Sequence, residues 1–229
     1  MNAFQNFWNG LDWSLPLNML ISVIPALLCI TLHELSHGFV ALKLGDTTAK
    51  DMGRLTLNPI KHIDIMGLIM MIVFHFGWAK PVPVDMRRFR NPKRDMAICA
   101  AAGPLCNLVL GAFLLFVYGL IYFPLVGNGA GWAYILLQTV GTTAYMSLAL
   151  AVFNLLPISP LDGSKVLFSF LKPHQYYKLM RYERYGMIVL IVLMLTDILG
   201  NPLSAVTGWV YDRLFFLAEW GGELFMKIF

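Results

Sequence analysis

Five consecutive residues, His33-Glu34-Leu35-Ser36-His37, carry the clearest chemical signal in the chain. Histidines four residues apart lie on one face of a helix, about 6 Å from each other. Two imidazoles in this arrangement can bind one metal ion, and a glutamate between them is placed to take a proton from water. Imidazole nitrogen suits zinc better than copper or iron at a hydrolytic site. The pattern therefore predicts a zinc site with Glu34 as base; the simpler alternative is two core histidines that hydrogen-bond to backbone or water.

A catalytic zinc ion usually has three protein ligands and one open position, so a third ligand must come from elsewhere. Asp162 is a candidate, because the prolines and glycine around it predict an unwound helix end that can turn the carboxylate inward. A helix cap is the competing interpretation of this aspartate. His62 and His174 lie in polar segments and are expected to be solvated or interfacial. His75, between two phenylalanines, is expected to be a core residue unless it enters the cavity.

The composition decides the class of protein. Of 229 residues, 58% are apolar and 13% are charged, and the mean hydropathy is +0.67. Soluble domains have roughly 45–50% apolar and about 25% charged residues, so we expect a membrane protein with several spans. The net charge of +4 is explained by basic residues that flank such spans, and nucleic acid is not an expected partner. Three cysteines, an odd number, argue against a disulfide framework.

Apolar stretches along the chain predict the membrane helices. Residues 17–44 form the first and contain the two histidines. Residues 96–161 carry no Asp, Glu, Lys, Arg or His and suit two spans with a glycine-rich turn at residues 124–131. Residues 185–199 suit another span, and the tail from Pro202 suits a last span or an interfacial helix. We therefore expect an all-α polytopic fold with about four to six transmembrane helices, each of about 20 residues.

Two smaller elements are expected beside these spans. Alternation at residues 54–58 and the Pro-Val-Pro pattern within residues 80–84 predict a membrane-associated β element that could receive an extended substrate by edge pairing. Residues 65–79 are too short for two crossings, and basic residues on both sides place both ends in the cytoplasm. We therefore expect a re-entrant segment there. By the same charge rule, the active site lies nearer the cytoplasmic side and the N-terminus lies outside.

A second motif, Asn154-Leu155-Leu156-Pro157-Ile158-Ser159-Pro160-Leu161-Asp162-Gly163, joins the first. Together the two motifs resemble those of the site-2 protease family of intramembrane zinc metalloproteases. Residues 53–59, 77–84 and 102–107 look like the compact bacterial and archaeal branch of that family. The similarity covers about residues 17–170, and the chain has no room for the PDZ or CBS domain that some relatives carry. We expect a single intramembrane metalloprotease domain over residues 1–229.

The resemblance implies a complete catalytic site. Its residues would be the ligands of one Zn²⁺ ion (His33, His37, Asp162), the general base and later acid (Glu34), and contacts of the substrate or transition state (Asn154, Asn107). The resemblance also implies cleavage of peptide bonds within or near transmembrane segments of proteins or peptides, in the lipid of the cell membrane. Asp85 and Ser164 differ from the residues common in the family, which affects substrate preference and not the ligand set.

Two other functions remain as alternatives. A transporter with a buried ion site is disfavoured, because transporters usually show repeats and polar residues in several spans. An inactive scaffold is disfavoured, because the ligands and Glu34 are complete. The sequence indicates no oligomeric state.

Overall fold

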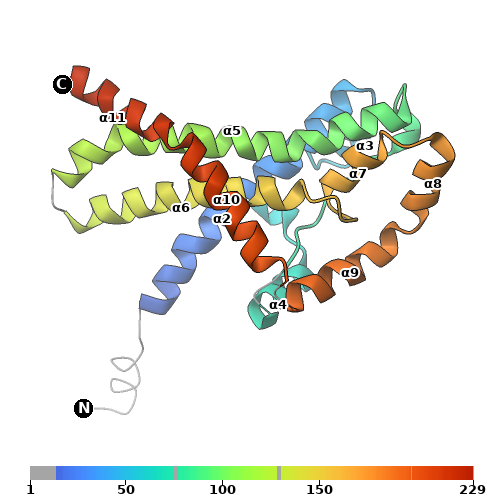
Figure 1. Ribbon diagram of the computed structural model, residues 1–229, viewed down its shortest axis with the longest axis horizontal. Helices are drawn as coiled ribbons and strands as arrows, with labels where there is room; N and C mark the ends of the chain where they lie inside the picture. The colour runs from blue at the N-terminus through green and yellow to red at the C-terminus, as the bar shows by residue number, and fades with distance from the viewer. Residues whose placement is uncertain (1–13, 75–76, 128–129, 197, 229) are drawn as a thin grey trace, which may run out of the picture.

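The computed structural model describes residues 14–74, 77–127, 130–196 and 198–228. These residues are mostly helical, as predicted, and contain no β-strand. Figure 1 shows the long helices α2, α5 and α6 packed on one another, with shorter helices from the second half of the chain around them. The helices are α2 (Ser14–Lys43), α3 (Thr48–Asp51), α4 (Ile65–Phe74), α5 (Pro92–Val126), α6 (Gly131–Asn154), α7 (Asp162–Phe168), α8 (Pro173–Arg181), α9 (Glu183–Leu195), α10 (Gly200–Leu214) and α11 (Phe216–Ile228), with 3-10 turns η1 (Pro59–His62) and η2 (Met86–Arg88).

Three of the described helices are long and apolar enough to cross a membrane. They are Val23–Lys43 within α2, with 21 residues, and the whole of α5 and α6, with 35 and 24 residues. A hydrocarbon core about 30 Å thick needs about 20 helical residues. Residues 96–161 divide into two long helices as predicted, because α5 ends at Val126 and α6 begins at Gly131.

The C-terminal third does not form the straight span predicted at residues 185–199. Helix α9 ends at Leu195, and the chain turns by 88° before Gly200 begins α10. If this bent pair of helices counts as one broken span, the described residues contain four candidate spans, and otherwise three. The prediction of four to six spans is therefore not confirmed. The bend accounts for the difference, because a single apolar run becomes two short elements that run in different directions.

Helix α5 is the element on which the other long helices pack. It contacts α2, α6, α7 and α11, and α6 runs beside it in the opposite direction (Figure 1). Leu115 of α5 and Ala144 and Leu148 of α6 are fully buried between them. The other face of α5 exposes apolar side chains at a four-residue spacing: Leu105, Val109 and Phe113 are 57%, 67% and 60% exposed. An apolar outer face of this extent fits a helix that contacts lipid.

The two ends of the segment expected to be re-entrant lie side by side. Ile63 and Ala79 form an isolated antiparallel bridge, and the Lys80 amide donates to the His62 carbonyl at 2.9 Å. Between these ends α4 has ten residues, about 15 Å of helix, which is too short to cross. The strands predicted at residues 54–58 and 80–84 are not confirmed, since this bridge is the one strand-like pairing among the described residues. The depth of α4 in a membrane stays a prediction.

Glycines allow α11 to lie directly on α5. A Cβ added at Gly119 would overlap the Ala218 carbonyl, and one added at Gly221 would overlap the Phe116 carbonyl. Small residues at such a crossing let two helix backbones approach closely. The neighbours on both sides are backbone atoms, which cannot move aside as a flexible side chain can.

Replacing Gly221 by alanine is expected to lower the melting temperature of the detergent-solubilised protein. The overpacked methyl group should reduce the free energy of unfolding by about 1–3 kcal/mol. Gly208 is the matched control, because it also lies inside a helix but has nothing within 4 Å of an added Cβ. Gly208→Ala is expected to leave the melting temperature unchanged or to raise it, since alanine favours the helix by about 1 kcal/mol. Equal melting temperatures for the two variants would contradict the close α5–α11 contact.

Candidate active site

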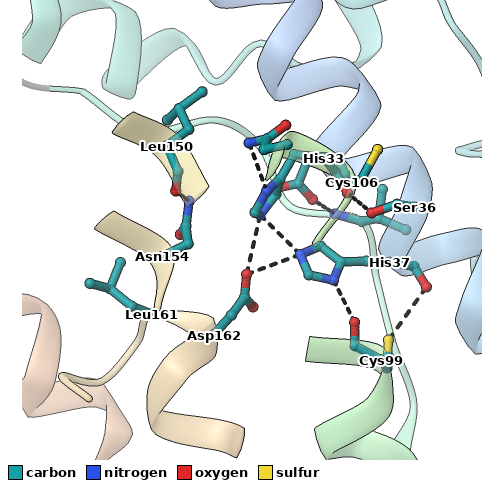
Figure 2. A network of polar contacts seen from close by, with 12 residues as sticks. His33, Ser36, His37, Cys99, Cys106, Leu150, Asn154, Leu161 and Asp162 are labelled. Atoms are coloured by element: carbon teal, nitrogen blue, oxygen red, sulfur yellow. Dashed lines mark hydrogen bonds and ion pairs between the residues drawn. The ribbon is translucent and has the colours of Figure 1, made fainter. Parts of the chain in front are cut away.

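Three side chains from two distant parts of the chain meet at one point. His33 and His37 come from α2 and Asp162 from the first residue of α7 (Figure 2). The two Nε2 atoms are 3.0 Å apart, and Oδ2 of Asp162 lies 3.2 Å from Nε2 of His33 and 3.1 Å from Nε2 of His37. All three residues are buried. The structure therefore brings together the two predicted histidines and the predicted third ligand.

The spacing of these atoms fits a zinc ion. Ligand atoms about 2.0–2.1 Å from a tetrahedral ion lie roughly 3.3 Å from one another, close to the observed separations. Two imidazoles and one carboxylate leave the fourth position open, which is the pattern of a catalytic zinc site rather than a structural one. The donor set and its geometry thus support one zinc ion bound by His33, His37 and Asp162.

Asp162 reaches the histidines because the helix before it ends early. Helix α6 ends at Asn154, and α7 begins only at Asp162, so the chain between them is free to turn. Gly163 packs against the Leu155 carbonyl at a distance that leaves no room for a Cβ. The turn directs the Asp162 carboxylate toward Nε2 of both imidazoles.

The nitrogen of each histidine that faces away from the site has its own partner. Nδ1 of His37 lies 2.8 Å from the Cys99 carbonyl, so this nitrogen carries the proton and Nε2 offers its lone pair. Nδ1 of His33 lies 3.2 Å from Nδ2 of Asn107, whose Oδ1 is buried without a partner. Turning this amide by 180° brings Oδ1 to Nδ1–H of His33 and frees Nε2 of His33 for a metal. A metal bound to Nε2 of His33 therefore requires the turned orientation, in which Asn107 accepts a hydrogen bond from His33.

The partners of the histidines lie on one face of α5. Cys99, Gly103 and Asn107 follow one another at a four-residue spacing, as His33 and His37 do on α2. Between the two polar contacts, Gly103 faces the imidazoles, and a Cβ added there would overlap Nε2 of both histidines. This face of α5 therefore contacts both imidazoles at Nδ1 and leaves no room for a side chain beside Nε2.

Asn107 is buried behind His33 and away from the cavity wall. It is fully buried, and its backbone carbonyl accepts a hydrogen bond from Ser147 Oγ at 2.7 Å. It is absent from the residues that line the cavity. The structure gives Asn107 a contact with His33, and its expected contact with a substrate stays a prediction. Asn154, in contrast, lines the cavity, although its Nδ2 also donates to the Leu150 carbonyl at 3.0 Å (Figure 2).

A cavity of about 580 Å³ opens in front of the three metal-binding side chains. Glu34 and Asn154 line it together with His33, His37 and Asp162. Most of the remaining wall is apolar and comes from residues 77–84 and from α5, α6 and α9. A cavity of this size and character has room for a short stretch of extended peptide.

His62 and His174, the other histidines that the structure describes, do not reach the site. His62 is buried, and its Nε2 lies 2.9 Å from the Thr56 carbonyl, so the expectation of a solvated side chain is wrong. His62 belongs to η1, which packs against α2, and its polar neighbours in sequence did not indicate this contact. His174 is exposed on α8, as expected. His75 lies outside the described residues. The three cysteines are free thiols, in agreement with the sequence analysis.

Sequence analysis missed the backbone groups of the site. The Cys99 carbonyl orients His37, and the Val82 amide donates to Oε2 of Glu34 at 2.8 Å. Every residue has these groups, so the residue type at either position carries no signal. The four-residue spacing of Cys99, Gly103 and Asn107 is the pattern that could have indicated a helix face turned toward the histidines.

Comparison with known proteins agrees with this geometry. The model of peptidase family M50 matches residues 121–196, a stretch that includes Asp162. The Bacillus subtilis protein described as "Putative zinc metalloprotease YwhC" is 40% identical over 193 residues, which cover 82% of this chain and 83% of that protein. The chain belongs to peptidase family M50. This is the site-2 protease family that the two motifs resemble, and the chain is accordingly a zinc metallopeptidase.

Other relatives in family M50 differ more in sequence. "Putative zinc metalloprotease Rip2" of Mycolicibacterium smegmatis is 30% identical over 228 residues, covering 95% of this chain and 85% of the relative. "Zinc metalloprotease MJ0392" of Methanocaldococcus jannaschii is 31% identical over 150 residues, covering 65% of this chain and 34% of the relative. No solved structure is significantly similar to the chain.

Gly103→Ala is expected to weaken zinc binding about 10–100-fold, because the added methyl group pushes both imidazoles out of place. The measurement is zinc retained per chain against a chelator of known affinity. Gly111→Ala is the control on the same helix, since its Cβ would press on Leu148 and Ala144 of α6 and not on the site. This control should lose stability but keep zinc. Normal zinc affinity in Gly103→Ala would contradict the close contact.

Asn107→Leu should also weaken zinc binding, by about 10–100-fold, because it removes the acceptor behind His33. Asn107→Asp keeps a side-chain oxygen at this position and is expected to retain most of the affinity. Metal titration of both variants checks this. If Asn107→Leu binds zinc as tightly as Asn107→Asp, the amide does not orient His33.

Proposed function

We propose that this member of family M50 is an intramembrane zinc endopeptidase, which hydrolyses peptide bonds within or near transmembrane segments of membrane proteins or peptides. One observation carries the proposal: the three metal-binding residues and Glu34 line a single cavity, in a chain whose described residues include three long apolar helices. A glutamate inside an apolar span is costly, by about 2.5–3.5 kcal/mol or more for a charged side chain, so it indicates function. The substrate and the surrounding lipid are the partners in this proposal.

His33, His37 and Asp162 would hold the zinc ion, and Glu34 would move the protons. Zinc bound at this site supplies a Lewis acid that lowers the pKa of water toward 7 and polarises a carbonyl. Glu34 takes the proton of the attacking water and then delivers it to the leaving amine. Because Glu34 is only half-buried and faces the cavity, water and substrate can both reach it.

Asn154 is placed to stabilise negative charge on the scissile carbonyl oxygen. Its amide nitrogen donates one hydrogen to the Leu150 carbonyl, and the second hydrogen remains for a group in the cavity. A preorganised donor of this kind is most effective where water is excluded. Asn154 is therefore the side chain that we assign to the transition state.

The substrate must be extended when it reaches the site, because a helix hides its carbonyls in its own hydrogen bonds. Pairing of the substrate as a strand with residues 80–83 is not favoured. Pro81 and Pro83 have no N–H, and the amides of Lys80 and Val82 already donate to His62 and Glu34. An incoming peptide therefore finds no free N–H between residues 80 and 83.

We place the site toward the cytoplasm. Six basic residues lie between Lys80 and Arg94, next to the N-terminal end of α5, and the turn at its far end has none. His37 is six residues from the end of α2 at Lys43, about 9 Å along the helix. The N-terminus then lies on the outer side.

The decisive experiment reconstitutes the protein in liposomes with a panel of single-span substrates and compares wild type with Glu34→Gln. Glu34→Gln is expected to cleave at least about 10²-fold more slowly, because it cannot accept the proton, while both proteins hold one zinc ion per chain. Zinc content is measured on the same samples.

Other outcomes would favour the alternatives. Zinc in the wild type without cleavage of any substrate indicates an inactive scaffold. A wild type that binds no zinc contradicts the assignment of His33, His37 and Asp162. Equal cleavage by Glu34→Gln contradicts the role of the glutamate.

A further inference from the structure

A buried arginine outside the metal site is bonded to the backbone beside the proposed base. Arg54 is only 9% exposed. Its Nη2 donates to two successive carbonyls, of Lys80 at 3.0 Å and of Pro81 at 3.2 Å. The second of these carbonyls belongs to the peptide unit whose nitrogen is that of Val82. Arg54 therefore holds the peptide between Pro81 and Val82 from its carbonyl end.

The other end of the same peptide reaches Glu34. The Val82 N–H donates to Oε2 of Glu34 at 2.8 Å. Pro81 and Pro83 have no N–H, so Val82 supplies the one amide hydrogen between residues 81 and 83. One rigid peptide plane thus connects the guanidinium of Arg54 to the carboxylate of Glu34, and the bond to a charged acceptor is of the stronger kind.

Packing keeps this peptide against α2. Gly38, which directly follows His37, lies under both Leu55 and Val82, and a Cβ added there would overlap the side chains of both residues. Leu55 is the neighbour of Arg54 in sequence. The absent side chain at position 38 therefore lets the arginine segment and the Val82 segment settle on the helix turn that carries the base.

We propose that Arg54 and the Val82 peptide are positioning groups that hold the Glu34 carboxylate in its working orientation. The inference rests on the proposed role of Glu34 as base. A glutamate has three side-chain torsions, and an unrestrained carboxylate at the cavity wall would sample several of them. Fixing Oε2 leaves Oε1 to exchange the proton. Catalysis is sensitive to such restraint, since a misplacement of about 1 Å can cost about 10²-fold in rate.

A purely structural role for Arg54 makes different predictions. If it only joined two loops, its loss would lower stability and zinc content together. Positioning of Glu34 predicts instead a lower kcat with KM and zinc content retained, because the metal ligands are held by α5 and α7 and not by Arg54.

The kinetic test uses the full chain in liposomes, with the single-span substrate that the wild type cleaves fastest. Val82→Pro removes the amide hydrogen and suits the extended backbone that Pro83 already imposes. Val82→Ala, the matched control, keeps the hydrogen. We expect kcat of Val82→Pro to be about 10–100-fold below that of Val82→Ala, with KM within about threefold and one zinc ion per chain in both.

The same experiment is made at Arg54. Arg54→Met is expected to lower kcat about 10-fold or more, and Arg54→Lys, which can reach one carbonyl, should recover part of the loss. Because both positions act through one peptide, Arg54→Met should add little to the effect of Val82→Pro in the double variant. Multiplication of the two effects would overturn the assignment of Arg54.

Amide hydrogen exchange provides a readout independent of activity. Val82 has the one exchangeable amide of residues 81–83, so its exchange can be isolated by mass spectrometry of overlapping peptides. Exchange at Val82 should be about 10-fold faster or more in Glu34→Ala and Arg54→Met than in the wild type. Unchanged exchange in Glu34→Ala, or equal kcat for Val82→Pro and Val82→Ala, would overturn the inference. A wild type without activity would contradict the proposed function, while the exchange experiment would still decide the contact.

Discussion

Three polar side chains buried among apolar helices constrain the rest of this structure. Removing an imidazole or a carboxylate from water is unfavourable unless each polar atom finds a partner. For His33, His37 and Asp162 those partners are one another on the cavity side and α5 on the far side. This requirement explains why α5 lies so close to α2 that there is no room for a side chain at Gly103. It also explains why α6 must end at Asn154, so that Asp162 can face the histidines.

This constraint gives the outer and inner faces of the long helices different roles. Helices α2, α5 and α6 present apolar outer faces that fit a lipid environment, and their inner faces carry the polar contacts. The segments with irregular backbone, residues 77–85 and 155–161, line the same cavity. Non-helical backbone at membrane depth is tolerated only where protein or a water-filled cavity satisfies it. The position of these segments at the cavity agrees with that rule.

The sequence predicted the side chains of the site better than its surroundings. His33, Glu34 and His37 were found because a four-residue spacing has one geometric meaning on a helix. For Asp162 the composition favoured a helix cap, and the prolines made a ligand only a candidate; the resemblance to the site-2 protease family implied it as the third ligand. The strand predicted at residues 54–58 is absent for a physical reason. Leu55 packs at Gly38 while Leu57 is 65% exposed, so the alternation of residue types there reflects contact with a helix and not with a sheet. The roles of the Cys99 carbonyl and the Val82 amide could not be predicted, because backbone groups have no signature in the sequence.

The position of Asp162 relative to the histidines has a consequence for the folding of the chain. The ligands lie roughly 130 residues apart, so a shared ion closes a very long loop and acts as a cross-link between the two halves of the protein. Such a cross-link adds its binding energy to the stability of the folded state and contributes nothing to the unfolded one. With the ion bound, the stability of the fold would therefore depend on the free zinc concentration as well as on the packing of the helices.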